Sequence, residues 1–90
     1  MTDYDYTIYP DNSPTIFKQV CADLERNIAS IIRDRLAIDV DGSTIQLYHL
    51  ADADGAKREI LVYDDYDVGA VYVKSQIDLD GIIQKEAYLK

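Results

Sequence analysis

The residues of this chain that could do chemistry are mostly acidic, and they recur at a fixed spacing. The pattern Asp-x-Asp occurs five times, and three of these pairs run directly into glycine. Two carboxylates followed by Gly match the middle of a calcium-binding EF-hand loop. The match fails at both ends, because a loop around Asp52 would have Leu50 and Leu61 at the first and last ligand positions. We therefore expect hairpin turns at these motifs and no metal site.

The single histidine and the single cysteine offer little for catalysis. A Cys–His dyad requires Cys21 and His49 to meet in space beside an orienting third group, and nothing in the sequence brings them together. His49 lies within an alternating apolar segment and Cys21 lies on or beside an apolar stripe, so packing roles are expected. The four glycines are scattered singly and form no phosphate-binding loop. The sequence predicts a protein without catalytic residues or cofactor.

The net charge of -8 limits the partners that the chain can have. Nucleic acid and anionic membranes both require a cationic surface, so direct binding to either is disfavoured and a basic protein partner is favoured. The acidity comes from 14 Asp and only 3 Glu, and part of that bias is structural because Asp prefers turns and helix caps. Without a long apolar run or a secretory signal, we expect one cytoplasmic domain over residues 1–90.

These acidic residues must be positioned by a fold whose central element is an amphipathic helix. Apolar residues recur at helical spacing from about Thr15 to Leu36. Ser13 suits the N-cap, and Pro14 suits the first helical position, where its missing N–H costs nothing. The stripe predicts that Leu24 and Ile28 are buried against a sheet.

The rest of the chain alternates with the period of β-strands. The predicted strands are Tyr4–Tyr9, Ala37–Val40, Ser43–Ala51, Lys57–Tyr63 and Ala70–Ile77. Asp-Gly before Ser43 and after Ala53 indicates tight type I′ hairpins with positive φ at Gly42 and Gly55. Leu79–Leu89 fits either a short C-terminal helix or an added strand. The order β-α-β-β-β-β predicts an α+β fold, with one long helix packed across an antiparallel four- to five-stranded meander.

In such a meander the turns alternate between the two ends of the sheet, so the aspartates should form two acidic rims. One rim would gather Asp11, Asp41, Asp64, Asp65 and Asp67, and the other Asp3, Asp5, Asp52, Asp54, Asp78 and Asp80. If the aliphatic rows face the helix, Tyr48 and Tyr72 stand on the open face of the sheet. Together with Tyr63 they are candidate contacts, since Tyr is enriched at interfaces, although ordinary cross-strand pairing also explains them.

These features favour a non-enzymatic binding or inhibitor protein that docks on a basic, nucleic-acid-handling partner through Asp41, Asp52, Asp54, Asp64, Asp65 and Asp67. In being small, acidic and devoid of catalytic groups, the chain resembles the uracil-glycosylase inhibitors and phage-encoded anti-defence proteins, which implies mimicry of nucleic acid. Its order of elements is similar to that of cystatin-like proteins. Two alternatives stay open: an immunity protein or antitoxin against a basic nuclease, and a structural subunit that self-associates, for example as a homodimer.

Overall fold

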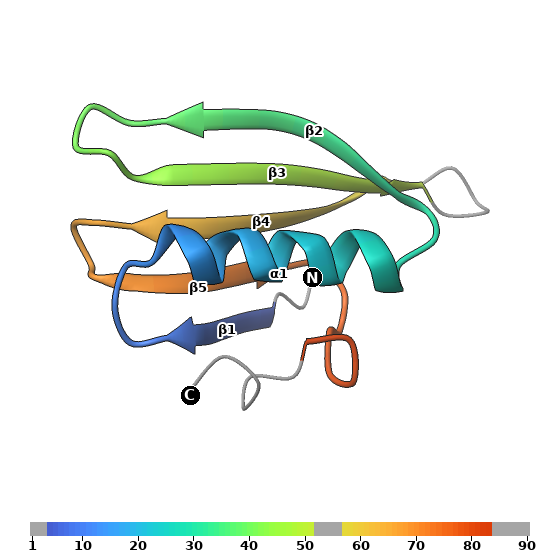
Figure 1. The fold of residues 1–90 in the computed structure, drawn as a ribbon. Helices are drawn as coiled ribbons and strands as arrows, with labels where there is room; N and C mark the ends of the chain where they lie inside the picture. The colour runs from blue at the N-terminus through green and yellow to red at the C-terminus, as the bar shows by residue number, and fades with distance from the viewer. Residues whose placement is uncertain (1–3, 52–56, 84–90) are drawn as a thin grey trace.

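The computed structural model describes residues 4–51 and 57–83, and Figure 1 draws the other residues as a grey trace. The elements are β1 (Tyr4–Tyr9), α1 (Pro14–Asn27), β2 (Ile31–Ile38), β3 (Thr44–Ala51), β4 (Lys57–Asp65) and β5 (Ala70–Ser75). The strands form one five-stranded antiparallel sheet in the order β1-β5-β4-β3-β2. The predicted α+β fold is confirmed. The meander runs from β2 to β5, and β1 is added beside β5.

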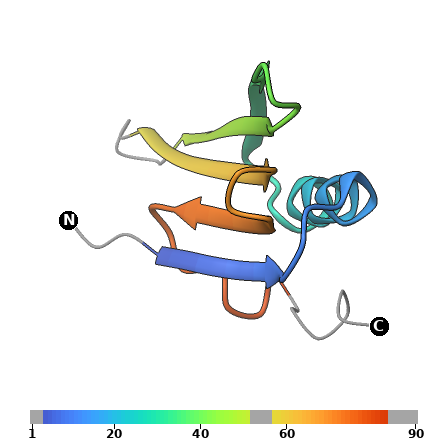
Figure 2. The same ribbon diagram turned by 90° about the vertical axis from the view of Figure 1, so that its left-hand side faces the viewer.

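Helix α1 covers one face of the sheet, and none of the described residues forms a helix on the other face (Figure 2). Its buried side chains, Phe17, Val20 and Leu24, pack above the central strands, with β4 in closest contact. The helix begins as predicted, because the Ser13 side chain accepts the Ile16 N–H at 3.2 Å and Pro14 follows. Leu24 and the following Ile28 are buried, as predicted. None of the described helical residues forms a span long and apolar enough to cross a membrane.

The predicted end of the helix at Leu36 is wrong. The helix ends at Asn27, with Ile28 already extended as its C-cap, and β2 begins at Ile31. The spacing of one helix face continues through Ile28, Ile31 and Ile32. The last two nevertheless belong to the sheet, where they lie opposite Leu50 and His49 of β3. Their β-branched side chains fit the pleated sheet better than a helix interior. The strand predicted from Ala37 is therefore only the last part of β2.

The placement of Tyr48 on the open face is also wrong. Tyr48 is fully buried on the helix side, in register with the buried Ile60 of β4. The other row of β3 faces away from the helix, and its Ile45 and Leu47 are only half-buried. The row that faces away, with Ile45 and Leu47, is the more apolar one, because Tyr48 shares its row with Thr44 and Gln46. Alternation therefore pointed to the wrong row.

The turn between β2 and β3 confirms one prediction and corrects another. Gly42 has a φ of +93°, as predicted. The turn is not type I′, because no described residue other than glycine has positive φ. A longer connection forms instead, in which the N–H of Asp39 donates to the Ser43 carbonyl and the N–H of Gly42 to the Asp39 carbonyl. Gly55 and residues 84–89 lie outside the described residues. Leu79, which is buried, opens a short turn in which its carbonyl accepts the Ile83 N–H.

Candidate functional site

Three connections meet at one end of the sheet (Figure 1). They are residues 10–13 between β1 and α1, 39–43 between β2 and β3, and 66–69 between β4 and β5. Four exposed aspartates lie in these connections. We call these connections, together with Asp64 and Asp65 at the end of β4, the acidic end. Its six aspartates are Asp11, Asp39, Asp41, Asp64, Asp65 and Asp67, and it contains no Lys or Arg. The predicted clustering of this rim is confirmed.

Hydrogen bonds join the three connections into one surface. The backbone N–H of Tyr66 donates to Ser43 Oγ at 2.9 Å, which ties the two hairpin turns together. The N–H of Ser13 donates to Asp64 Oδ1 at 2.9 Å, which ties the start of α1 to the end of β4. A Cβ atom on Gly42 would lie 3.4 Å from the ring of Tyr66, which is ordinary van der Waals contact, so the positive φ of this residue is what favours glycine here. The acidic end is therefore held by contacts between its parts.

Most carboxylates at this end also hold the turn in which they lie. Asp11, Asp39 and Asp41 each accept a backbone N–H, from Asn12, Val40 and Ser43, at 2.7–2.9 Å. Each uses one carboxylate oxygen and leaves the other without a bond from a described residue. Only the short Asp side chain reaches a backbone group one or two residues ahead in this way. This local geometry explains why the chain uses Asp where Glu would supply the same charge.

Two predicted site residues, Asp64 and Asp65, are less available to a partner than the sequence suggested. Asp64 is 2% exposed, which contradicts the expectation of a solvated turn carboxylate. Asp65 is half-buried and accepts bonds from the Val68 N–H, the Tyr72 hydroxyl and the Asp67 N–H. These bonds, the one from Val68 first, lower the pKa of Asp65 below its usual value. The exposed anions of this end are Asp11, Asp39, Asp41 and Asp67.

Exposed apolar side chains stand among these anions. Val40 is 103% exposed, Val68 67% and Tyr66 42%, and all three lie in the two hairpin turns of the acidic end. Exposed apolar residues surrounded by charged ones are the arrangement of a protein interface, with an apolar centre and a polar rim. The sequence prediction overlooked these three residues, although turn positions occupied by Val and Tyr were a visible signal.

The opposite rim is described only in part. Asp5, Asp78 and Asp80 are exposed there, while Asp52 and Asp54 lie outside the described residues. Asp78 Oδ1 accepts the Tyr6 hydroxyl at 3.2 Å and the Asp80 N–H at 2.9 Å. Asp5 lies directly opposite Lys74 in the pairing of β1 with β5. Among the described residues, this rim thus carries both positive and negative side chains, whereas the acidic end carries only negative ones.

Tyr63 and Tyr72 stack on the face of the sheet that no described element covers. Their ring centroids are 4.5 Å apart and their planes differ by 11°. The Tyr72 hydroxyl donates to Asp65 Oδ2 at 3.0 Å, and burial together with this bond raises the pKa of Tyr72 to about 12. Tyr63 and Tyr72 thus pair across neighbouring strands, as one of the two sequence interpretations held. Both are half-buried, and the stack adjoins the acidic end through Asp65.

Cys21 and His49 lie on opposite faces of the sheet and form no dyad. His49 Nδ1 lies 2.8 Å from Asp34 Oδ2 and its Nε2 lies 3.6 Å from Glu59 Oε2, on the open face. Cys21 belongs to α1 on the other face, and burial raises the pKa of its thiol, which disfavours the reactive thiolate. No group of metal-binding side chains occurs among the residues that the structure describes.

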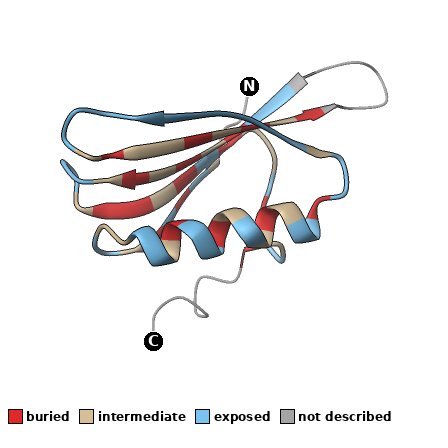
Figure 3. Cartoon of the chain, turned by 45° about the horizontal axis from the view of Figure 1, so that its top comes forward, coloured by how far each residue is buried: buried red, intermediate tan, exposed pale blue. Residues whose placement is uncertain are grey.

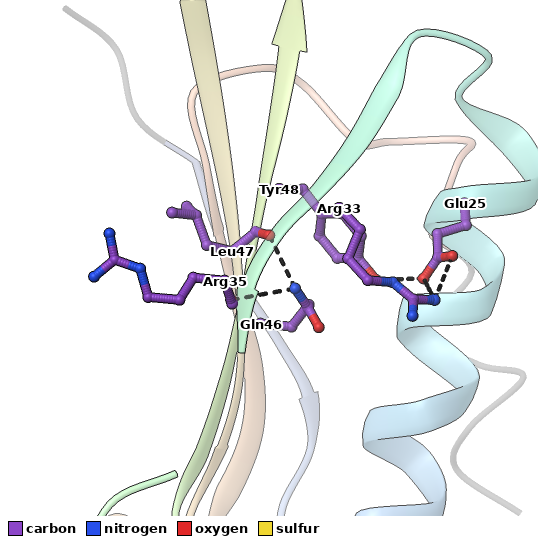
Figure 4. A network of polar contacts seen from close by, with 6 residues as sticks. All are labelled: Glu25, Arg33, Arg35, Gln46, Leu47 and Tyr48. Atoms are coloured by element: carbon purple, nitrogen blue, oxygen red, sulfur yellow. Dashed lines mark hydrogen bonds and ion pairs between the residues drawn. The ribbon is translucent and has the colours of Figure 1, made fainter. Parts of the chain in front are cut away.

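A polar cluster between α1 and the sheet escaped the sequence prediction. The Tyr48 hydroxyl donates to Glu25 Oε2 at 2.7 Å, and Arg33 Nη2 donates to both carboxylate oxygens at 2.6 and 2.7 Å (Figure 4). The bond from Tyr48, followed by that from Arg33, lowers the pKa of Glu25. The cluster borders an open cleft of about 400 Å³ between α1 and β2, lined also by Leu36. It bridges the helix to β2 and β3 and thereby holds the helix over the sheet.

These observations define the class of the protein: one helix on a five-stranded antiparallel sheet, with an anionic end whose turns are joined by hydrogen bonds. Comparison with protein families, with curated proteins and with solved structures gives no match to this chain. The function must therefore be argued from the surface.

Proposed function

We propose that the protein is a non-enzymatic binding protein whose acidic end docks on the basic surface of a protein that handles nucleic acid. The observation that carries this proposal is the combination at one end of exposed Asp11, Asp39, Asp41 and Asp67 with exposed apolar side chains in the same turns. Charge of one sign steers association with an oppositely charged surface. Apolar and aromatic side chains at the centre of a charged patch supply the contacts that slow dissociation.

The nature of the partner follows from the charge. A protein surface that concentrates Lys and Arg is typical of proteins that bind the phosphate backbone. A compact anionic end that lacks cations fits such a surface and competes there with nucleic acid. Inhibition by occupation of that surface requires no catalytic group. An antitoxin that neutralises a basic nuclease would act through the same contacts. Only the identity of the partner protein distinguishes an antitoxin from other inhibitors of this kind.

The test is affinity capture from the native host with the full chain as bait. Asp64 is buried, so the informative variant changes only exposed residues: Asp39, Asp41 and Asp67 to Asn. The matched control removes three exposed carboxylates elsewhere, through Asp5→Asn, Glu59→Gln and Asp80→Asn. We expect the bait to capture a basic protein, and high salt and added duplex DNA should each release it. The first variant should fail to capture this protein, whereas the control variant should still capture it. Exposed charges act over only about 10 Å at 0.1 M salt, which is why salt should release it.

A partner that both variants retain equally, and that neither salt nor DNA displaces, would contradict the proposal. Replacing Tyr66 by Ala adds a kinetic test on the captured pair. The loss of an exposed aromatic contact should speed dissociation and leave association nearly unchanged, whereas the Asp variant should mainly slow association.

A further inference from the structure

Strand β2 forms a free edge of the sheet and carries much of the exposed apolar surface. The large apolar side chains exposed on or directly after this strand are Ile32, Leu36, Ile38 and Val40. Figure 3 shows β2 as a nearly continuous exposed band, while β3 beside it is buried or intermediate along most of its length. A free edge presents unpaired N–H and C=O groups to which another strand can add. An edge that is also apolar is a candidate docking surface.

A bulge restricts where such a strand can add. The register of β2 with β3 shifts between Arg33 and Leu36, so that Asp34 and Arg35 together stand opposite Leu47. The side chain of Gln46 repairs the bulge by donating to the Arg35 carbonyl at 3.2 Å. Bulges interrupt regular pairing and bend the strand. The regular part of the edge therefore lies after the bulge, from Leu36 to Ile38, with Arg35 and Asp39 at its two ends.

The hydrogen bonds to β3 show which backbone groups of this stretch are free. The N–H of Asp39 donates to the Ser43 carbonyl at 2.8 Å. Bonded and non-bonded residues alternate along an antiparallel pair, so Ala37 is bonded to β3 as well. The N–H and C=O groups of Leu36 and Ile38 then point to the free edge.

The side chains of the same stretch divide between the two faces of the sheet. Leu36 and Ile38 pair with Gln46 and Thr44, on the helix side, and are 53% and 69% exposed. Arg35 points away from the helix (Figure 4), and alternation places the side chains of Ala37 and Asp39 on that face too. Arg35 has no ion-pair partner among the described residues. The stretch thus offers an aliphatic row on one face and a cation, a methyl group and an anion on the other.

We propose that a second copy of the chain adds to this edge in antiparallel orientation, about a two-fold axis at Ala37. In this register Leu36 lies opposite the partner's Ile38, and their outward backbone groups exchange hydrogen bonds on both sides of the axis. On the other face, Arg35 lies opposite the partner's Asp39, and Ala37 opposite the partner's Ala37. The two sheets join into one continuous sheet of ten strands, with both helices on the same face.

Three properties favour a second copy as the occupant. The order cation, small residue, anion around Ala37 is self-complementary only when the partner strand is antiparallel, as a two-fold interface requires. The central pair is of the non-hydrogen-bonded kind, whose Cα atoms lie about 4.5 Å apart, and a methyl group fits there. The antiparallel arrangement also sends the two acidic ends in opposite directions, which limits repulsion between two chains of charge -8.

The contact is small for a protein interface. Pairing of about five residues per chain covers less than the 1,200–2,000 Å² that stable complexes usually bury. We therefore expect a weak dimer that forms and dissociates with concentration. Asp39 belongs to both surfaces, whereas Asp11, Asp41 and Asp67 of the acidic end lie outside the paired stretch. The inference itself rests on the edge of β2 and not on the proposed function.

The first test uses sedimentation equilibrium of the full chain over a wide concentration range. In the dimer of either single variant, Arg35→Asp or Asp39→Arg, positions 35 and 39 carry the same charge and face each other on both sides of the axis. Each variant should therefore weaken the dimer about tenfold. When the two variants are mixed, every pair across the axis is again of opposite sign, so the mixture should associate like the original chain. The double variant should do the same. Circular dichroism checks that each variant is folded, because the Asp39 carboxylate also holds the Val40 N–H.

The second test measures the register. In a background with Cys21→Ala, Ala37→Cys should form an intermolecular disulfide under mild oxidation, because the two Cα atoms lie within disulfide range. Ala29→Cys, an exposed position just before β2, is the matched control and should form far less. A chain that sediments as a monomer at every concentration would overturn the proposal. A dimer that forms through the open face would also overturn it: both charge variants would leave that dimer intact, and Leu47→Asp would abolish it. A monomer that binds only a foreign extended peptide at this edge would overturn it as well.

Discussion

Replacing Asp64 by Ala tests whether the end of β4 holds the start of α1. Asp64 Oδ1 accepts the Ser13 N–H at 2.9 Å, while Ser13 Oγ accepts the Ile16 N–H as the helix cap. Asp64 is almost fully buried, so water cannot take over its role once the carboxylate is removed. The substitution leaves the Ser13 N–H without its partner and takes an anion from beside the helix N-terminus.

The expected loss of stability follows from these two effects. An interior N–H left without a partner costs about 1–3 kcal/mol, and an anion at a helix N-terminus contributes about 0.3–1 kcal/mol. Removing the desolvation cost of a buried carboxylate offsets part of this sum. We expect a net loss of about 1–3 kcal/mol, with Tm falling about 4–8 °C for each kcal/mol in a domain of this size. Asp64→Asn keeps an acceptor oxygen and should lose clearly less.

The control is Asp67→Ala, because Asp67 is exposed and its carboxylate accepts no bond from a described residue. That change should stay within about 0.5 kcal/mol. Thermal and urea unfolding followed by far-ultraviolet circular dichroism at pH 7 measures all three variants. Equal unfolding curves for the Asp64 and Asp67 variants would refute the view that Asp64 anchors the helix. The aspartates of the acidic end would then be interchangeable solvent-facing charges.

Three further predictions rest on single contacts. Leu24→Ala should cost about 2–5 kcal/mol in urea unfolding, because Leu24 is fully buried under the helix. Gly42→Val should lower Tm, since φ is +93° there and a Cβ would meet the Tyr66 ring; an unchanged Tm would contradict this turn geometry. The pKa of Glu25 is lowered in the fold, chiefly by Tyr48. Its stabilising effect is present above the unfolded pKa of roughly 4.3 and is lost as pH falls through the folded value. Glu25→Gln should therefore flatten the fall of stability in acid, as measured by denaturant unfolding at stepped pH.

The sequence predicted the α+β fold and most strands because the apolar periodicity and the turn and cap residues indicate the same elements there. Ser13 and Pro14 start the helix as the pattern indicated. The end of the helix was missed because Ile28 and Ile31 satisfy helical spacing, while the break at residues 29–30 carries neither Gly nor Pro. Only the pairing of β2 with β3 decides that these residues are extended, and such long-range pairing overrides a local pattern.

The clustering of the aspartates at one end was predictable from the sequence, but which of them are exposed was not. The turns gather the aspartates at one end because strand direction alternates in any meander. Whether an aspartate is exposed depends on what lies above it, and the helix N-terminus lies above Asp64 but not above Asp67. Tyr48 was misplaced because the opposite row of β3, with Ile45 and Leu47, is the more apolar of the two, and only the position of α1 selects the buried row.

The widths of the two layers explain why apolar surface stays exposed on the helix side of the sheet. Five strands spaced about 4.8 Å apart place the outer two roughly 19 Å from each other, whereas a helix with its side chains is about 10–12 Å wide. One helix can therefore cover little more than half of the sheet. Because α1 packs on β4, the uncovered part on the helix side includes β2, and the cleft beside Leu36 marks the boundary. The apolar side chains of β2 either face water or are covered by another chain, and the self-complementary order around Ala37 favours the second copy. This edge runs into the acidic end at Asp39, so a second copy on β2 and a partner at the acidic end would share that residue.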